Sequence, residues 1–197
     1  MNQFFRLEKS VPDIVHPTFF RGKSMADHDD DGPDYIVEQN KIITELSKML
    51  GKPDDDLHHS PVPLFMGGPP DVFVFSSSDN GGVFYVTAGL TSEGTGQEPN
   101  DLGQYEIAIA TRKSADWVAD LASKLGLYSL QAVLSHGETL ELGDALPSGS
   151  TISAFLLLDY NGEEHFQIDG RECHILLAVG LTKRELDAYR KGDREKL

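Results

Sequence analysis

The residues whose types and spacing come nearest to a binding chemistry lie in an acidic segment near the N-terminus. The segment matches the pattern D-x-D-x-D-G-x5-E of a calcium loop, with carboxylates at Asp27, Asp29, Asp31 and Glu38 and a glycine at Gly32. In such a loop the carboxylates ligate Ca²⁺ and the glycine permits a sharp turn. A calcium-dependent binding module that uses residues 27–38 is therefore one interpretation of the sequence.

The surroundings of this pattern favour another role for the acids. Pro17 and Gly22 lie just upstream, so no entering helix can orient the first carboxylate. The eighth position, where calcium loops carry a buried aliphatic residue, is Asp34. We therefore predict no metal site and no cofactor. We expect the acids to complement the positive N-terminal end of a helix that begins near Asp34.

Residue types used in catalysis are present, but they are not spaced as catalytic groups. His58 and His59 are adjacent, so on an extended segment their side chains point apart, and no cysteine or third histidine lies nearby. Cys173 and His174 would face opposite sides of one strand. The sequence contains no G-x-S-x-G nucleophile elbow. We predict that the chain is not an enzyme, and an enzyme with an unrecognised site remains an alternative.

The net charge of the chain limits its partners. It has 17 Lys and Arg against 32 Asp and Glu, a net charge of −15, which argues against nucleic acid as a partner. Residues 27–56 hold ten acids and three lysines, close to half of this charge. We expect another protein as the partner, and a basic toxin is one candidate. The residues that we predict to face it are the acids Asp54, Asp55, Asp56, Glu93 and Glu98.

Composition also bears on location. Cys173 is the single cysteine, so no internal disulfide can form, and its apolar strand predicts a buried, inert thiol. No apolar run approaches the ~20 residues of a membrane span. Phe4 and Phe5 are followed at once by Arg6 and Glu8, which is unlike a signal peptide. We expect a cytoplasmic protein that binds no membrane.

Three helices can be predicted from apolar spacing and capping residues. The first runs from Asp34 to Leu50 and is stopped by the following glycine and proline. The second begins after Ser114, carries Trp117 on its apolar face and ends at Gly126. Residues 182–185, Thr-Lys-Arg-Glu, form a capping box for the last helix.

The strand pattern predicts the fold class. Strands are expected at 71–75, 82–90, 104–110, 151–160, 163–168 and 171–180. The turns Asn161–Gly162 and Asp169–Gly170 predict that the last three form an antiparallel meander. We predict an α+β fold, a mainly antiparallel mixed sheet with helices packed on one side. Residues 1–34 would form an irregular N-terminal arm and residues 35–197 a single domain.

From about Glu38 to the end, the order of these parts resembles the Suppressor of fused-like domains. The segments that carry the resemblance are Leu50–Pro53, Asp71–Phe75, Tyr85–Thr91, the strand 105–107, Gly137–Gly143 and Ile175–Leu186. The resemblance implies the same α+β class and no enzymatic activity.

The resemblance also implies a kind of function. Bacterial members are similar to immunity or antitoxin proteins that bind and silence a partner toxin. The animal member is a negative regulator that sequesters a transcription factor by gripping an extended peptide. This chain is shorter than the animal protein and has one domain, so we expect the bacterial, immunity-type function.

Overall fold

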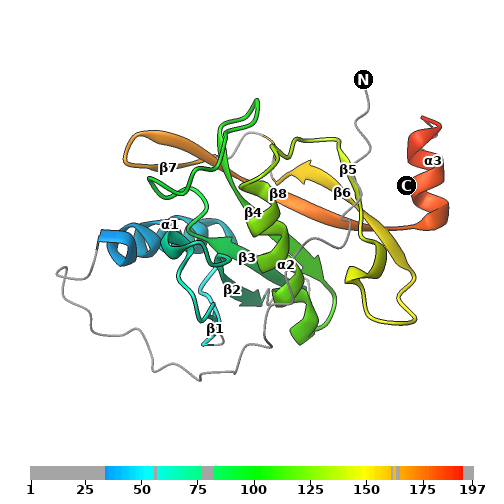
Figure 1. Cartoon of the computed structure of the whole chain (residues 1–197), viewed down its shortest axis with the longest axis horizontal. Coiled ribbons are helices and arrows are strands. Elements are labelled where there is room, and N and C mark those ends of the chain that lie inside the picture. Colours follow the sequence, from blue (N-terminus) through cyan, green and yellow to red (C-terminus); the bar gives the residue numbers. More distant parts are fainter. Residues whose placement is uncertain (1–33, 56, 77–81, 161, 163–164, 193–197) are drawn as a thin grey trace.

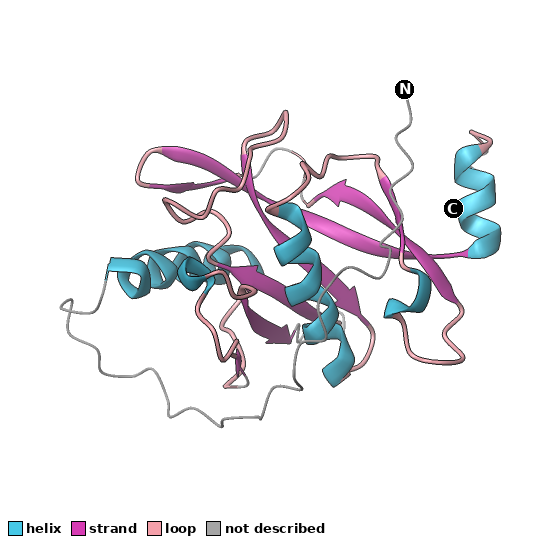
Figure 2. Cartoon of the chain, viewed as in Figure 1, coloured by secondary structure: helices cyan, strands magenta, loops and turns pink. Residues whose placement is uncertain are grey.

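The computed structural model describes residues 34–55, 57–76, 82–160, 162 and 165–192 (Figure 1). The arm predicted for residues 1–34 lies, apart from Asp34, outside the described residues. The described part of the chain forms one mixed sheet flanked by helices (Figure 2). The α+β class predicted from the sequence is confirmed.

The sheet has the strand order β1-β2-β3-β4-β8-β6-β5, and β7 pairs with β8 beside this path. Its central pair, β4 and β8, is parallel, and the other strand pairs described are antiparallel. The strands are β1 (Leu57–His58), β2 (Asp71–Ser76), β3 (Val83–Ala88), β4 (Gln104–Thr111), β5 (Thr139–Glu141), β6 (Ile152–Asp159), β7 (Phe166–Ile168) and β8 (Arg171–Thr182).

The helices are α1 (Asp34–Leu50), α2 (Asp116–Ser129) and α3 (Lys183–Arg190), with short 3-10 helices η1 (Leu64–Met66) and η2 (Gly143–Ala145). Gly51, with φ of 92°, ends α1 as predicted, because the left-handed backbone that it adopts is accessible to glycine. The capping box of α3 is confirmed: the N–H of Glu185 donates to Thr182 Oγ1, and the N–H of Thr182 donates to the Glu185 carboxylate.

The helices do not share one side of the sheet, which corrects the arrangement predicted. Val72 and Val74 of β2 pack in the core that contains α2, whereas Phe73 and Phe75 pack in the core that contains α1. Because alternate strand residues face opposite ways, α1 and α2 cover opposite faces. A third core joins α3 to β6 and β8 at the end of the sheet remote from α1 (Figure 1). The central strand β4 is consequently buried on both faces.

Three details of α2 differ from the prediction. The helix begins after Ala115, and it continues through Gly126 to Ser129. Glycine at position 126 allows α2 to pack closely, because a Cβ there would lie 2.5 Å from Pro70 Cγ. Trp117 is 40% exposed and does not belong to the buried face of the helix.

The predicted meander is also wrong in one respect. The Asp169–Gly170 turn does join β7 to β8, with Ile168 opposite Arg171 and φ of 49° at Asp169. However, β6 pairs with β8 and not with β7. The twelve-residue strand β8 is long enough to pair with β7 at its start and with β6 along its remainder.

Candidate interaction surface

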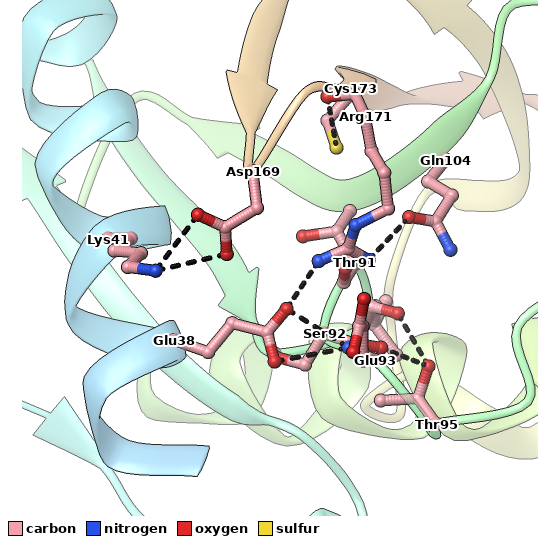
Figure 3. Close-up of polar contacts among 12 residues, drawn as sticks. Glu38, Lys41, Thr91, Ser92, Glu93, Thr95, Gln104, Asp169, Arg171 and Cys173 are labelled. Atoms are coloured by element: carbon pink, nitrogen blue, oxygen red, sulfur yellow. Dashed lines mark hydrogen bonds and ion pairs between the residues drawn. The ribbon is translucent and has the colours of Figure 1, made fainter. Parts of the chain in front are cut away.

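Glu38, the last acid of the calcium pattern, lies on α1 and bonds to Arg171 of β8 (Figure 3). Its carboxylate also accepts the backbone N–H of Glu93 at 3.0 and 3.1 Å. Arg171 donates further to the carbonyl of Thr91 at 2.6 Å and to Gln104 Oε1 at 2.9 Å. This network ties α1 to the loop between β3 and β4, so Glu38 has a structural role.

The other acids of the pattern, Asp27, Asp29 and Asp31, lie outside the described residues. Within the residues that are described, no group of three or more His, Cys, Asp or Glu side chains is placed to hold a metal ion. The absence of a calcium site stays a prediction.

Glu106 lies on β4 where β3 separates from it, and its side chain is wholly buried. Its carboxylate accepts four hydrogen bonds, from the N–H and hydroxyl of Thr91, the N–H of Gly89 and the hydroxyl of Thr87, at 2.7–3.0 Å. Burial raises the pKa of Glu106, and these donors oppose the rise. The carboxylate accepts bonds from backbone groups that the separated strands no longer pair.

His174 is buried between the side-chain oxygens of Asn100 and Asp159. Its Nε2 lies 3.1 Å from Asn100 Oδ1, and its Nδ1 lies 3.1 Å from Asp159 Oδ1. The Asn100 amide is held in one orientation, because its oxygen accepts the N–H of Leu102 and its nitrogen donates to the carbonyl of Leu134. Burial lowers the pKa of His174, and the Asp159 carboxylate opposes that effect. The contacts join the β3–β4 loop to β6 and β8.

Of the two adjacent histidines, His58 ends β1, and His59, which follows it, pairs with Asp71. His59 Nδ1 lies 3.1 Å from Asp71 Oδ2, and Asp71 also accepts the N–H of Ser60 and the amide of Gln39. The hydrogen bond to Asp71 raises the pKa of His59. Although burial acts in the opposite direction, the bonds from His59 and Gln39 lower the pKa of Asp71. Asp71 thus connects β2 to α1 and to the end of β1.

Cys173 is buried, as predicted from its apolar strand. Burial raises the pKa of its thiol to about 11, so little thiolate forms at neutral pH. Cys173 packs in the α1 core, and the neighbouring His174 faces the other side of the strand.

The acids predicted to face a partner lie in two segments. Asp54 and Asp55 are exposed just before β1, and Asp54 accepts a bond from the Ser76 hydroxyl at 2.6 Å. Glu93 and Glu98 are exposed in the β3–β4 loop, and Asp56 lies outside the described residues.

A group of exposed apolar side chains was not identified from the sequence. Tyr35 at the start of α1 and Phe65 of η1 are in ring contact, with centroids 4.6 Å apart. Val62 and Met66 belong to the same loop, and the four side chains are 41–67% exposed. We call Tyr35, Val62, Phe65 and Met66 the apolar surface cluster. In the sequence, the cluster is indicated only by the apolar triplet 64–66, which lies between prolines and two glycines. A triplet is too short for its periodicity to predict a structure.

None of the helices in the described residues is both long and apolar enough to cross a membrane.

Comparison with known proteins identifies the family. The model of the Suppressor of fused protein (SUFU) family matches residues 68–197. No curated protein sequence matches the chain. A chain in the crystal structure of the Sufu–Fu complex is similar, with a TM-score of 0.63 and 14% identity over 78% of this chain and 79% of that chain.

Two further solved structures share the fold. A putative SUFU homologue from Neisseria gonorrhoeae FA 1090 has a TM-score of 0.60 and 15% identity over 82% of this chain and 92% of that one. Drosophila Suppressor of Fused has a TM-score of 0.57 and 14% identity over 74% of this chain, which spans 42% of its length. With the family model covering well over half of its residues, this chain belongs to the Suppressor of fused protein family.

Proposed function

We propose that this chain is a non-enzymatic domain that binds another protein. The observation that carries the proposal is that buried and half-buried polar side chains bond to the chain itself. Glu38, Glu106 and His174 each bond to groups of the chain itself and connect separate elements. Side chains committed to such bonds hold the fold together and are not arranged as nucleophile, base and orienting group around a substrate.

Family membership supports the same function. One similar solved structure is the Sufu–Fu complex, in which a protein of this fold is bound to another protein. At 14% identity the similarity shows the fold alone, so binding by this chain is an inference from its own surface and its family.

The finer proposal is that this chain is an immunity or antitoxin-type protein of the cytoplasm and that its partner is a basic toxin. A net charge of −15 would attract such a partner and raise the rate of encounter. The exposed acids Asp54, Asp55, Glu93 and Glu98 are the residues that we assign to this attraction.

Affinity capture from lysate of the native host tests the proposal when the captured protein is then purified. The expected result is a single protein that binds the purified chain with saturation and whose toxicity on expression is relieved by co-expression of this chain. A partner that binds but is not toxic would overturn the immunity function and leave protein binding intact.

Two further assays address the alternatives. Turnover of an ester, phosphate or glycoside substrate that is lost on a single substitution would show an enzyme. A melting temperature that rises with micromolar Ca²⁺ and reverts in Glu38→Gln would show a calcium-dependent module.

A further inference from the structure

We propose that the apolar surface cluster is the docking site for a partner segment in which aromatic or long aliphatic side chains are flanked by Lys or Arg. The inference rests on the proposed function, since it names the chemistry of the bound protein. It assigns the principal contact to these apolar side chains, with the exposed acid Glu93 beside them.

The loop that carries the cluster is built to hold its shape. The N–H groups of Met66 and Gly68 donate to the carbonyl of Pro63 at 2.9 and 3.1 Å, and the N–H of Gly67 donates to the carbonyl of Leu64 at 2.9 Å. Gly67 has φ of 86°, and a Cβ at Gly68 would lie 1.8 Å from the carbonyl oxygen of Val62. The turn therefore requires both glycines at these positions.

The same loop is anchored from beneath. Leu64 packs against the α2 core, beside the backbone of Gly89. Its neighbours Phe65 and Met66 are 61% and 67% exposed. A loop that buries one apolar residue and holds the next two in solvent keeps them ordered before binding, which reduces the entropy lost on association.

The size and types of these side chains suit a protein partner. Tyr35 and Phe65 offer rigid aromatic surface, and aromatic residues are enriched among the residues that dominate binding energy. Met66 is flexible and polarisable, so it can adapt to the shape of an apolar partner. Exposed apolar groups gathered in this way mark protein interaction sites.

Charge selects the flanking residues of the partner. Glu38 lies one turn after Tyr35 on α1, and its bond to the N–H of Glu93 brings the β3–β4 loop beside the cluster. Glu93 is exposed there. Arg171 pairs with Glu38 and Lys41 pairs with Asp169, so each of these pairs carries no net charge. The exposed carboxylate of Glu93 therefore leaves a negative charge on this side of the cluster, which complements a basic residue that flanks the bound segment.

Selection of random peptides displayed on phage, with the full-length chain as bait, tests this inference. We expect enriched peptides that combine Phe, Trp, Leu or Met with Lys or Arg and whose binding weakens as salt increases. Their Kd should rise about tenfold or more for Phe65→Ser/Met66→Ser, as when central anchors are truncated. The matched control is Trp117→Ser/Val133→Ser, which removes two apolar side chains that are 40% and 37% exposed elsewhere on the surface and should leave Kd unchanged.

Other results would overturn the inference. Peptides that bind both double variants equally would place the site elsewhere, and peptides without basic residues would contradict its charge preference. If the wild-type chain sediments as a dimer and the Phe65→Ser/Met66→Ser chain as a monomer, a second copy of the chain occupies the cluster. Tighter peptide binding by full-length Phe19→Ser/Phe20→Ser would show that the N-terminal segment occupies it. If a native partner binds the Phe65→Ser/Met66→Ser chain normally, the proposed function stands and this docking site is wrong.

Discussion

At the scale of single residues, the carboxylate of Glu106 replaces the strand pairing that ends between β3 and β4. Two backbone N–H groups and two hydroxyls depend on it. A buried donor left without an acceptor destabilises the fold by about 1–3 kcal/mol.

We therefore predict that Glu106→Ala lowers the free energy of unfolding by about 3 kcal/mol or more, because two backbone donors lose their acceptor. Glu106→Gln should lose much less, since its amide oxygen can take the bonds at Oε1 while its nitrogen donates to Thr87. Urea unfolding measures both. Glu98→Ala, in the same loop but exposed, is the control and should stay within about 0.5 kcal/mol. Equal losses for Glu106→Ala and Glu98→Ala would contradict the assigned role.

The His59–Asp71 pair predicts a dependence of stability on pH. The pKa of His59 is raised from 6.5, so its contribution is complete below 6.5 and is lost as pH rises through the folded pKa. The pKa of Asp71 is lowered from 3.8, so its contribution is lost as pH falls through a value below 3.8. The pair therefore stabilises the fold most between these two limits.

Accordingly, we expect the wild-type chain to exceed His59→Gln in unfolding free energy by about 0.2–1 kcal/mol near pH 5.5, the range for exposed pairs. That difference should shrink as pH is raised to about 8.5, because the ring loses its proton and with it the attraction to Asp71 as pH rises through the folded pKa. Denaturant titrations at the two pH values measure it. A difference that grows with pH would show that the ion pair is not the source.

At the scale of elements, α2 shows how packing overrides helix propensity. Ala is a better helix former than Gly by about 1 kcal/mol. A Cβ at position 126 would nevertheless lie 2.5 Å from Pro70 Cγ and 3.2 Å from Thr87 Cγ2. Overpacking of this kind typically destabilises by about 1–3 kcal/mol.

We predict that Gly126→Ala lowers the melting temperature, whereas Asp120→Ala on the exposed side of the same helix leaves it nearly unchanged. Differential scanning calorimetry of the two variants makes the comparison. A higher melting temperature for Gly126→Ala than for wild type would mean that α2 can move away from Pro70, just before β2, and so make room for the Cβ.

The elements illustrate what local sequence determines here. Helix α1 and the capping box of α3 could be predicted because their apolar spacing and end residues are neighbours in the chain. The burial of both faces of β4 could not be predicted, because Ala108 shares a core with residues of α1, which lies far upstream in the chain. Gly126 looked like a helix end for the same reason: its contact with Pro70 is visible only in the folded chain.

The interaction surface was less predictable than the fold. Glu93 and Glu98 could be proposed as partner-facing residues from their charge, which any sequence shows. The apolar surface cluster needs Tyr35 and Phe65 from separate elements to meet, and no periodicity marks such a meeting. The role of Glu38 likewise depends on Arg171, which lies on a strand near the other end of the chain.

At the scale of the whole molecule, the net charge of −15 predicts steered association with a basic partner. Asp54→Asn/Asp55→Asn should lower the association rate constant several-fold at low salt and change the dissociation rate constant less, because exposed charges act on encounter. The control Asp116→Asn/Asp120→Asn removes the same charge from α2. Stopped-flow measurements over a range of salt concentrations give the association and dissociation rate constants of each variant. Equal effects of both variants would show that only the total charge matters.

Titrating the captured partner with the purified chain in a calorimeter tests whether the chain binds a protein and performs no chemistry on it. Intact masses of both proteins are then measured after prolonged incubation. We expect saturable binding with fixed stoichiometry and two unchanged masses. Absence of saturable binding, or a change in the mass of the partner that depends on this chain, would contradict it.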